Sequence, residues 1–543
     1  MVGLSASNRA KALFDALGND IRTSGIPFVT DISLSSMFQD LPNVFTTRSS
    51  QDDERLPVMA SFIRHMKFTR TAFVGVRDFV LSAALGEGLK KELGAGLIST
   101  QWLGSREAQP SPDEVVGVVS AIQENNPDLV VLGVGTTRSV PLINAMKAAG
   151  SAPALFLLGR IEALPAEVVS AYPNAIYQLT WDRLPEAYND EMRKLIASGS
   201  REDWLFEGRK IPEAPGWKSG ECKERPEDAV PDPLESANLR ALGIGTQFAD
   251  MVGLIATAAG RAQPLSDVDT LRRRVVMELK SSYAAGKGVY KGSFENWSFD
   301  PSSRAAVRTP FVIILPAGLG RTQLAPVQFV RQRGGTLRQI ETLYVDIDLI
   351  RLHRVDDNEK TFFAEFYLSM HHSETSSLDG IDFTNAYIDP KTNGRQISVE
   401  VLHGGGRSDS YPEGMKIYKI SGRFTYEPQL AQYPFDTQRF AIDLQPRRGD
   451  RPFIIQPPPL ELRDRQVTTD GWDPGLQYVG YGEDFVPVVD AYTHEPNVVP
   501  FYRASFVWLM KRQTTDYFLR VVVPLIFIMI VAYLSIFISQ AHF

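Results

Sequence analysis

Cysteine is almost absent from the chain. Cys222 is the one cysteine in 543 residues, so a disulfide within the chain and a metal site built from several cysteines are both excluded. The seven histidines are scattered, and the adjacent His371 and His372 would point to opposite faces of a strand. We therefore predict no metal site, and a stability that comes from packing.

Strong positive charge and the common catalytic motifs are also missing. No Lys/Arg run exceeds Arg272–Arg274 and the net charge is −7, which argues against nucleic acid as a partner. The sequence contains no GxSxG, GxxxxGK[ST] or HExxH motif, and Gly133-Val134-Gly135 is too short for a dinucleotide-binding fingerprint. These absences predict a protein that is not an enzyme and that carries no cofactor.

Length and composition predict several packed domains. At about 150 residues per domain the chain has room for three to four. Apolar residues make up 43% and charged residues 22%, which is typical of folded domains rather than of disordered or fibrous chains. We expect a multidomain protein with domains at residues 1–330, 340–512 and 517–540.

One apolar run lies at the C-terminus. The 23 residues after Arg520 read VVVPLIFIMIVAYLSIFISQAHF, long enough to cross a bilayer, which needs about 20. A buried core helix is the alternative, but such long runs are uncommon there. We predict one transmembrane helix over residues 517–540, and Pro524 suggests that it belongs to a bundle. Met1–Ser5 does not resemble the start of a secretory signal, so we expect truncation at both ends.

The first 330 residues alternate between strand and helix patterns. Alternation of this kind predicts an α/β fold with a parallel sheet covered on both faces. Open parallel sheets bind ligands beyond the carboxyl ends of their strands, where helix N-termini offer N–H groups. The expected strands are residues 26–30, 71–76, 129–135, 154–158 and 176–179, and the expected helices are residues 8–17, 56–65, 81–93, 112–125 and 140–149.

Four segments of this region resemble the type I periplasmic binding proteins, especially the branched-chain amino-acid group. They are SGIPFVTDISLSSMFQDLPNVFTTRSSQDDERLPVMASFIRHMKFTRTAFVGV, NPDLVVLGVGTTRSVPLINAMKAAG, GTQFADMVGLIATAAGRA and YKGSFENWSFDPSSR. The resemblance implies a two-lobed α/β domain that clamps a small-molecule ligand between its lobes. It implies an amino acid or a small carboxylate as the ligand, without a choice between them.

The resemblance also implies candidate ligand-binding residues. Ser7, Thr30 and Ser33 occupy the loops that hold a carboxylate in the first lobe of the family. The candidates in the second lobe follow its strands; they are Asp78, Phe79, Thr136, Thr137 and Arg160. Taken one by one, the Ser and Thr residues among them are better explained as ordinary helix N-caps.

From residue 340 to residue 512 the pattern changes to two-residue alternation. Short strands separated by Gly, Pro and Asn turns predict an all-β, immunoglobulin-like sandwich. The expected strands are residues 343–349, 362–368, 397–402, 415–425, 438–444, 477–480 and 502–510.

The segment GRFTYEPQLAQYPFDTQRF, residues 422–440, resembles the Cys-loop signature of pentameric ligand-gated ion channels. Pro434 favours a tight turn, either cis or trans, and Asp436 can accept N–H bonds or pair with a basic group within that turn. Tyr426 and Phe440 stand where animal members have the two cysteines, and an aromatic pair could close the loop by packing. The predicted gating loop comprises Tyr433, Pro434, Phe435, Asp436 and Gln438.

The resemblance continues to the end of the chain. Residues 472–484 resemble the penultimate strand of the family, residues 486–499 resemble the hairpin tip of its ligand loop C, and residues 501–512 resemble its last strand. The apolar run resembles its first membrane helix, and the second, pore-lining helix is missing. It implies a homopentamer of identical subunits in the lipid bilayer of the cell membrane, with residues 1–512 extracytoplasmic (periplasmic). The predicted function is the ligand-sensing part of a channel subunit. The alternative is a membrane-anchored solute-binding receptor that serves a transporter or a signalling kinase.

Overall fold

The computed structural model describes most of the chain. The described residues are 7–32, 34–48, 55–104, 109–161, 164–180, 236–262, 267–285, 287–292, 296–306, 312–318, 321–331, 336–371, 378–447, 453–457, 467–489 and 496–536. Contacts divide the chain into two compact units, residues 1–341 with 485–500 and residues 342–484 with 501–543. Each unit is described by itself.

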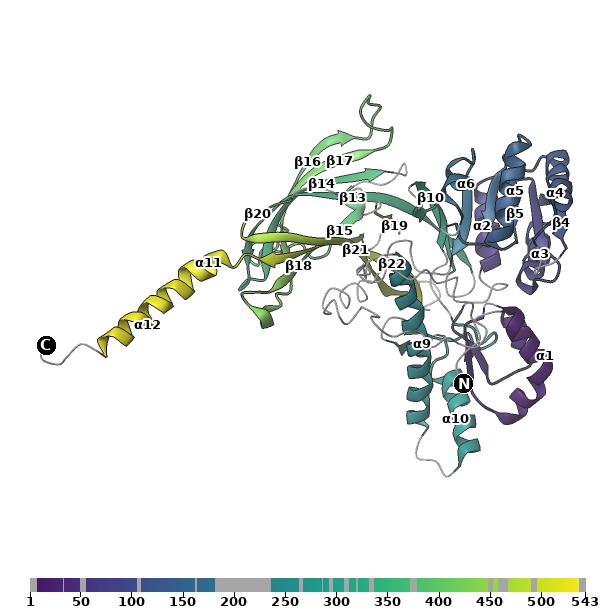
Figure 1. Cartoon of the computed structure of the whole chain (residues 1–543), viewed down its shortest axis with the longest axis horizontal. Coiled ribbons are helices and arrows are strands. Elements are labelled where there is room, and N and C mark those ends of the chain that lie inside the picture. The colour runs from purple at the N-terminus through teal and green to yellow at the C-terminus, as the bar shows by residue number, and fades with distance from the viewer. Residues whose placement is uncertain are drawn as a thin grey trace, which may run out of the picture. The chain divides into compact units, whose positions relative to one another are not determined.

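The first unit contains a seven-stranded sheet in the order β11-β10-β7-β6-β5-β3-β4 (Figure 1). The strands from β7 to β4 run parallel, and β10 and β11 add to the β7 edge in antiparallel fashion. The alternating pattern thus predicted the parallel sheet correctly. The strand bounds are β3 Thr71–Val76, β4 Leu97–Leu103, β5 Leu129–Leu132, β6 Ala154–Leu157, β7 Ile176–Thr180, β10 Val312–Gly318 and β11 Arg321–Leu324.

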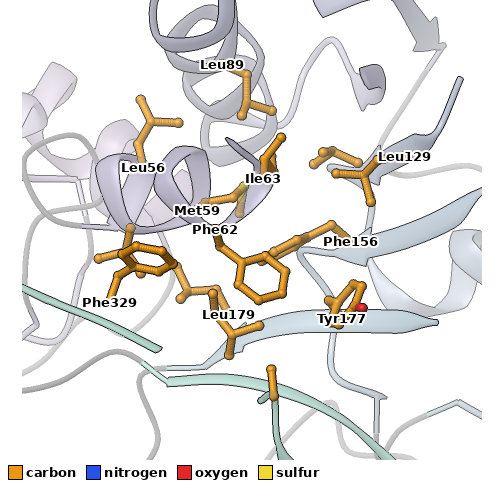
Figure 2. Close-up of a cluster of buried hydrophobic side chains, with 14 of the residues drawn as sticks. Leu56, Met59, Phe62, Ile63, Leu89, Leu129, Phe156, Tyr177, Leu179 and Phe329 are labelled. Carbon is orange, nitrogen blue, oxygen red and sulfur yellow. The ribbon is translucent and has the colours of Figure 1, made fainter. Parts of the chain in front are cut away.

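One face of this sheet carries a large apolar cluster (Figure 2). Leu129 and Val131 point into this cluster, where Phe62 of α2 packs edge-on against Tyr177 with ring centroids 5.0 Å apart. Val130 and Leu132 are also fully buried, and successive side chains of a strand alternate between faces. Both faces of β5 are therefore covered, as a near-continuous apolar strand requires.

The helices of this lobe begin and end close to the predicted positions. They are α2 Leu56–His65, α3 Val80–Leu93, α4 Pro112–Asn125, α5 Thr136–Ala148 and α6 Ala166–Ser170. Ser111 and Glu114 form a capping box before α4, and Asn126 ends that helix in the left-handed conformation at φ 40°. The prediction for α5 was wrong at its start, because Thr136 and Thr137 already belong to its first turn.

The other lobe of this unit is built on two short parallel strands, β1 (Phe28–Thr30) and β2 (Val44–Thr46). Phe28 and Val44 face α1 (Ser7–Ser24) and the short helix η1 (Ser35–Phe38). Val29 and Phe45 face the opposite cluster, which includes residues of α9 (Ser236–Arg261) and α10 (Val268–Ser281). Figure 1 shows α9 and α10 side by side. The unit is therefore two-lobed and α/β, as predicted.

The second unit is rich in β-strands, which lie in two sheets whose main ladders are antiparallel. One sheet has the order β13-β14-β17-β16 and the other the order β15-β18-β22-β21. This confirms a β-rich region, and its immunoglobulin-like topology stays a prediction. The strand bounds are β13 Leu337–Asp356, β14 Thr361–His371, β15 Ile381–Phe383, β16 Ile397–Gly404, β17 Lys416–Thr425, β18 Thr437–Pro446, β21 Trp472–Val489 and β22 Pro496–Arg512.

Aromatic side chains join the two sheets of the second unit. Phe362 on β14 packs against Phe440 on β18 with ring centroids 5.1 Å apart, and Phe366 lies 6.3 Å from Phe383 on β15. Phe440 also packs against Tyr426, at 5.0 Å, and both are buried. The prediction that this aromatic pair closes the loop by packing is confirmed.

An apolar helix follows β22. Phe518–Ser535 is one helix among the described residues that is long and apolar enough to cross a membrane, with a mean hydropathy of 2.4 over 18 residues. Its first turn, Phe518–Val522, is a π-helix, and α12 (Val523–Ser535) follows. Pro524 cannot donate an N–H bond to the turn before it, and this explains the wider turn there. The predicted residues 537–540 lie outside the described part.

Candidate functional site

The five candidate residues of the second lobe lie where the strands of the large sheet end. Asp78 and Phe79 follow β3, Thr136 and Thr137 begin α5 after β5, and Arg160 follows β6. Because β3, β5 and β6 are neighbouring parallel strands, their carboxyl ends lie side by side at the same end of the sheet. The structure therefore brings these residues to the position where open α/β sheets bind ligands.

Two glycines allow close approach at this end of the sheet. A Cβ atom on Gly159 would lie 2.7 Å from the Thr136 hydroxyl oxygen and 2.9 Å from its backbone nitrogen. A Cβ atom on Gly133 would lie 2.6 Å from the ring of Phe73. Real Cβ atoms do not approach other atoms this closely, so both positions require glycine. The first contact places Arg160, the next residue, beside the first turn of α5.

The first-lobe candidates have different outcomes. Thr30 ends β1 and is fully buried, and its hydroxyl donates to the Phe45 carbonyl at 3.0 Å. Ser7 is the first residue of α1, but its side chain, like the whole of Ser33, lies outside the described part. Asn8 donates to the Asp78 carbonyl at 3.3 Å, which joins the start of α1 to the end of β3 in the other lobe. A role for these residues in ligand binding stays a prediction.

An ion pair that the sequence analysis missed lies at the ends of β1 and β2. Arg48 binds Asp31 through Nε to Oδ1 and Nη2 to Oδ2, both at 2.6 Å. Gln247 on α9 donates to the same Oδ1 at 3.0 Å. Asp31 directly follows β1, and Arg48 stands two residues after β2. Opposite charges after two neighbouring strands were the signal that could have revealed this pair.

In the second unit, the predicted loop around Pro434 is bound to the end of the last strand. Asp436 is 1% exposed and accepts hydrogen bonds from Arg512 Nε at 2.9 Å and Arg512 Nη2 at 3.1 Å. The basic partner thus comes from β22 and not from within the turn, which corrects that prediction. The partner lies so close because Thr437 pairs with Lys511 in the β18–β22 ladder. The peptide bond between Tyr433 and Pro434 is cis.

The neighbours of Asp436 keep its carboxylate ionised. Gln438 is fully buried; it donates to Asp436 Oδ2 at 2.5 Å and to the Gln429 carbonyl at 2.9 Å. Burial alone would raise the pKa of Asp436, but the hydrogen bonds from Arg512 and Gln438 outweigh it and lower the pKa below its usual value. The carboxylate is therefore charged at neutral pH. Gln438 links it to the backbone of Gln429, at the start of the loop.

Arg512 joins the loop to further groups of the same unit. Its Nη2 pairs with Asp357 at 2.9 Å, and its guanidinium lies over the rings of Trp472 at 4.3 Å and Tyr433 at 5.0 Å. Asp357 also accepts a hydrogen bond from the Tyr426 hydroxyl. Burial and this hydrogen bond raise the pKa of Tyr426 far above its ordinary value. One cation thus holds two carboxylates and two aromatic rings together.

The tip of this loop faces the start of the apolar helix. Tyr433 is 52% and Phe435 56% exposed, so both rings project from the sandwich. Tyr433 packs edge-on against Tyr517 at 5.9 Å, and Phe435 against Phe518 at 6.5 Å. The two aromatic rings therefore form an apolar projection that contacts the beginning of the helix.

The first part of the chain is similar to known protein families and solved structures. A family model described as periplasmic binding protein matches residues 6–198. Similar solved structures include a leucine binding protein from Thermotoga maritima, at 13% identity and a TM-score of 0.40, with 60% of this chain and 78% of that chain covered. An amino acid ABC transporter substrate-binding protein from Pseudomonas fluorescens has 14% identity and a TM-score of 0.39, with 60% and 76% covered. A comparison with curated proteins gave no match. Residues 6–198 therefore belong to a periplasmic-binding-protein-like domain.

Proposed function

We propose that the chain is a membrane-anchored solute-binding receptor that serves a transporter or a signalling protein. The observation that carries this proposal is the family match over residues 6–198. The candidate residues at the neighbouring strand ends support a binding site there. The helix Phe518–Ser535 supplies the anchor, and residues 1–512 lie on the extracytoplasmic side. The solute is a small molecule such as an amino acid or a carboxylate.

Isothermal titration tests this function. The full chain in detergent is titrated with the twenty amino acids and with small mono- and dicarboxylates, and we expect heat from at least one compound. Thr137→Ala removes an exposed hydroxyl at the start of α5; the loss of a hydrogen bond to a charged group costs about 1.5–3 kcal/mol, or about 10- to 100-fold in Kd. Thr257→Ala is the matched control, because Thr257 is exposed and its hydroxyl donates to the Gly253 carbonyl on the same helix, α9. A folded chain that binds none of these compounds contradicts the proposal.

A second candidate function is favoured by the loop around Pro434. We propose that the second unit belongs to a pentameric ligand-gated channel subunit of identical chains, in which this loop passes the signal to the membrane helix. The aromatic contacts of Tyr433 with Tyr517 and of Phe435 with Phe518 support this role. The ion pair between Asp436 and Arg512 supports it as well, since it fixes the loop to the strand that leads into the helix.

Two measurements separate the candidates. Mass photometry of the full-length protein in detergent should show rings of five if it is a channel, and monomers alone would contradict that function. In a protein extended by the remaining membrane helices of the family, Phe435→Ala should then abolish ligand-evoked current in lipid vesicles and leave ligand affinity unchanged. Because the Phe435 side chain is 56% exposed, its removal should leave the fold intact. Leu430→Ala is the matched control, with an apolar side chain of the same loop that is 45% exposed. Unchanged current in Phe435→Ala would contradict the role of the loop.

A further inference from the structure

The tip of the loop in the second unit, residues 430–435, carries no charge. Its sequence is LAQYPF. Three of its side chains are large, apolar and about half exposed: Leu430 at 45%, Tyr433 at 52% and Phe435 at 56%. The charged residue that follows, Asp436, is 1% exposed and does not change this surface. Single exposed apolar residues are common, but a group of them at one tip is typical of an interaction surface.

This loop tip lies at the level of the first residues of the apolar helix. The ring centroid of Tyr433 is 5.9 Å from that of Tyr517, and the ring centroid of Phe435 is 6.5 Å from that of Phe518. The span Phe518–Ser535 has 18 residues, which makes it about 27 Å long at 1.5 Å per residue, close to the roughly 30 Å hydrocarbon core of a bilayer. Such a span fills the core when its first residue lies at the boundary between hydrocarbon and headgroups. The two rings of the loop tip then lie at the same boundary.

The base of the loop holds the tip in this position. Arg512, at the end of β22, binds the Asp436 carboxylate at 2.9 Å. Gln438 donates to the Gln429 carbonyl at 2.9 Å, and its own carbonyl oxygen accepts the Gln429 backbone N–H at 2.8 Å. Both ends of the tip are therefore fixed to the sandwich, so little conformational freedom is lost when the tip meets a partner.

We infer that the loop tip is a second contact with the bilayer, in which Tyr433 and Phe435 enter the interfacial layer of the lipid beside the helix. Aromatic side chains are enriched in this layer, where an apolar ring and a polar hydroxyl both find suitable surroundings. A single helix leaves the sandwich free to tilt over the membrane, and a second contact beside it restrains that tilt. This inference rests on the membrane anchor of the proposed function, and its partner is lipid rather than protein.

Site-directed spin labelling measures the depth of the loop tip in the membrane. Cys222 is the one cysteine of the chain, so Cys222→Ser provides a background in which a single cysteine carries the nitroxide. The full chain, labelled at Tyr433→Cys or at Phe435→Cys, is reconstituted into vesicles of phosphatidylcholine and phosphatidylglycerol. Collisions of the nitroxide with oxygen, which concentrates in lipid, are compared with collisions with a water-soluble nickel complex.

Two further labels calibrate this ratio of oxygen to nickel collisions. Ile528→Cys replaces a side chain of α12 that is 64% exposed and should report the hydrocarbon core. Tyr411→Cys replaces an aromatic side chain that is 42% exposed, on the turn between β16 and β17. The 10 residues of β17 separate this turn from the loop, a distance of about 33 Å along the strand. The ratio at positions 433 and 435 should be at least about 3-fold higher than at position 411 and lower than at position 528.

A matched pair of variants tests the apolar character of the tip, with the label at Tyr433→Cys. Phe435→Asp places a charge at the boundary, which opposes entry into lipid, so the ratio at position 433 should fall to the value at position 411. Phe435→Leu keeps an apolar side chain and should keep the ratio. Because Phe435 is 56% exposed, both variants should fold.

The outcomes separate this inference from the proposed anchor. Labels at positions 433 and 435 that match position 411, while position 528 reports lipid, overturn the lipid contact and leave the anchor standing. Labels at the tip that are shielded from both reagents show that protein covers it, either another helix or a second copy of the chain, and also overturn the inference. A label at position 528 that is open to the nickel complex overturns the anchor, and the lipid contact with it.

Discussion

Replacement of Asp436 by Asn should destabilise the second unit strongly. Asp436 is 1% exposed and bound to Arg512 and Gln438, and the substitution keeps its shape while removing its charge. Removal of one partner of a buried ion pair costs about 3–5 kcal/mol. Because Asp357 still pairs with Arg512 at 2.9 Å, we expect the lower end, a loss of about 3 kcal/mol in the free energy of unfolding.

The pH dependence of this loss has a defined sign. Burial would raise the pKa of Asp436, but hydrogen bonds from Arg512 and Gln438 lower it below the usual value of 3.8. A carboxylate with a lowered folded-state pKa contributes stability above its unfolded pKa and loses it as the pH falls through the folded pKa. The stability difference between the wild type and Asp436→Asn should therefore be constant from neutral pH to about pH 5, and it should shrink below about pH 4.

Urea denaturation of the full chain in detergent, followed by tryptophan fluorescence, measures this difference. Trp472 lies 4.3 Å from the Arg512 guanidinium and reports on the site directly. Asp473→Asn is the matched control, because Asp473 is exposed and accepts a hydrogen bond from the Gln513 side chain at 2.7 Å. Its free energy of unfolding should change by less than about 0.5 kcal/mol. A similarly small change in Asp436→Asn at neutral pH, or a difference that does not shrink in acid, would refute the reasoning.

Three further predictions concern packing, each measured by the same denaturation experiment. Phe440→Ala removes a fully buried ring and should cost about 3–5 kcal/mol, and a loss below about 1 kcal/mol would contradict the aromatic closure. Tyr426→Phe removes the hydrogen bond to Asp357 and should cost about 1 kcal/mol, whereas no loss would show that water replaces the bond. Gly133→Ala forces a methyl group against Phe73 and should lower the free energy of unfolding by about 1–3 kcal/mol. Its control, Gly117→Ala, lies in a helix with open space around it and should raise the free energy of unfolding by about 0.5–1 kcal/mol. Equal effects of the two substitutions would contradict the close approach of Gly133 to Phe73.

The sequence predicted elements best where their ends carry clear signals. The strand over residues 71–76 and the helices over residues 56–65 and 112–125 coincide with the structure. The strand is buried at every position, and both helices begin with a proline in their first turn. The start of α5 was missed because Thr136 and Thr137 are polar residues in a first turn, where helix and loop have the same composition. The expected strand of residues 477–480 became part of the much longer Trp472–Val489, whose turn-rich sequence hides its period.

The candidate sites were predicted unequally. The loop around Pro434 was recognised from a contiguous motif, and its aromatic closure by Tyr426 and Phe440 followed from the two positions alone. The ion pair between Asp31 and Arg48 was not predicted. It depends on β1 and β2 being parallel neighbours, and the apolar period of a strand does not reveal which strand it pairs with. Gln247 is still less predictable, since it reaches Asp31 from a helix 216 positions away in the sequence.

The attachment of the apolar helix to the sandwich follows from the strand ladder. Thr437 of β18 pairs with Lys511 of β22, so the next residues, Asp436 and Arg512, are adjacent whatever their side chains. The backbone N–H of Arg512 donates to the Asp436 carbonyl at 3.0 Å, and the buried ion pair adds charge to the same junction. The helix therefore begins a few residues beyond a point where loop and strand are fixed to each other. A displacement of the last strand must move the projecting rings of the loop with it, and this holds for a receptor anchor and for a channel subunit alike.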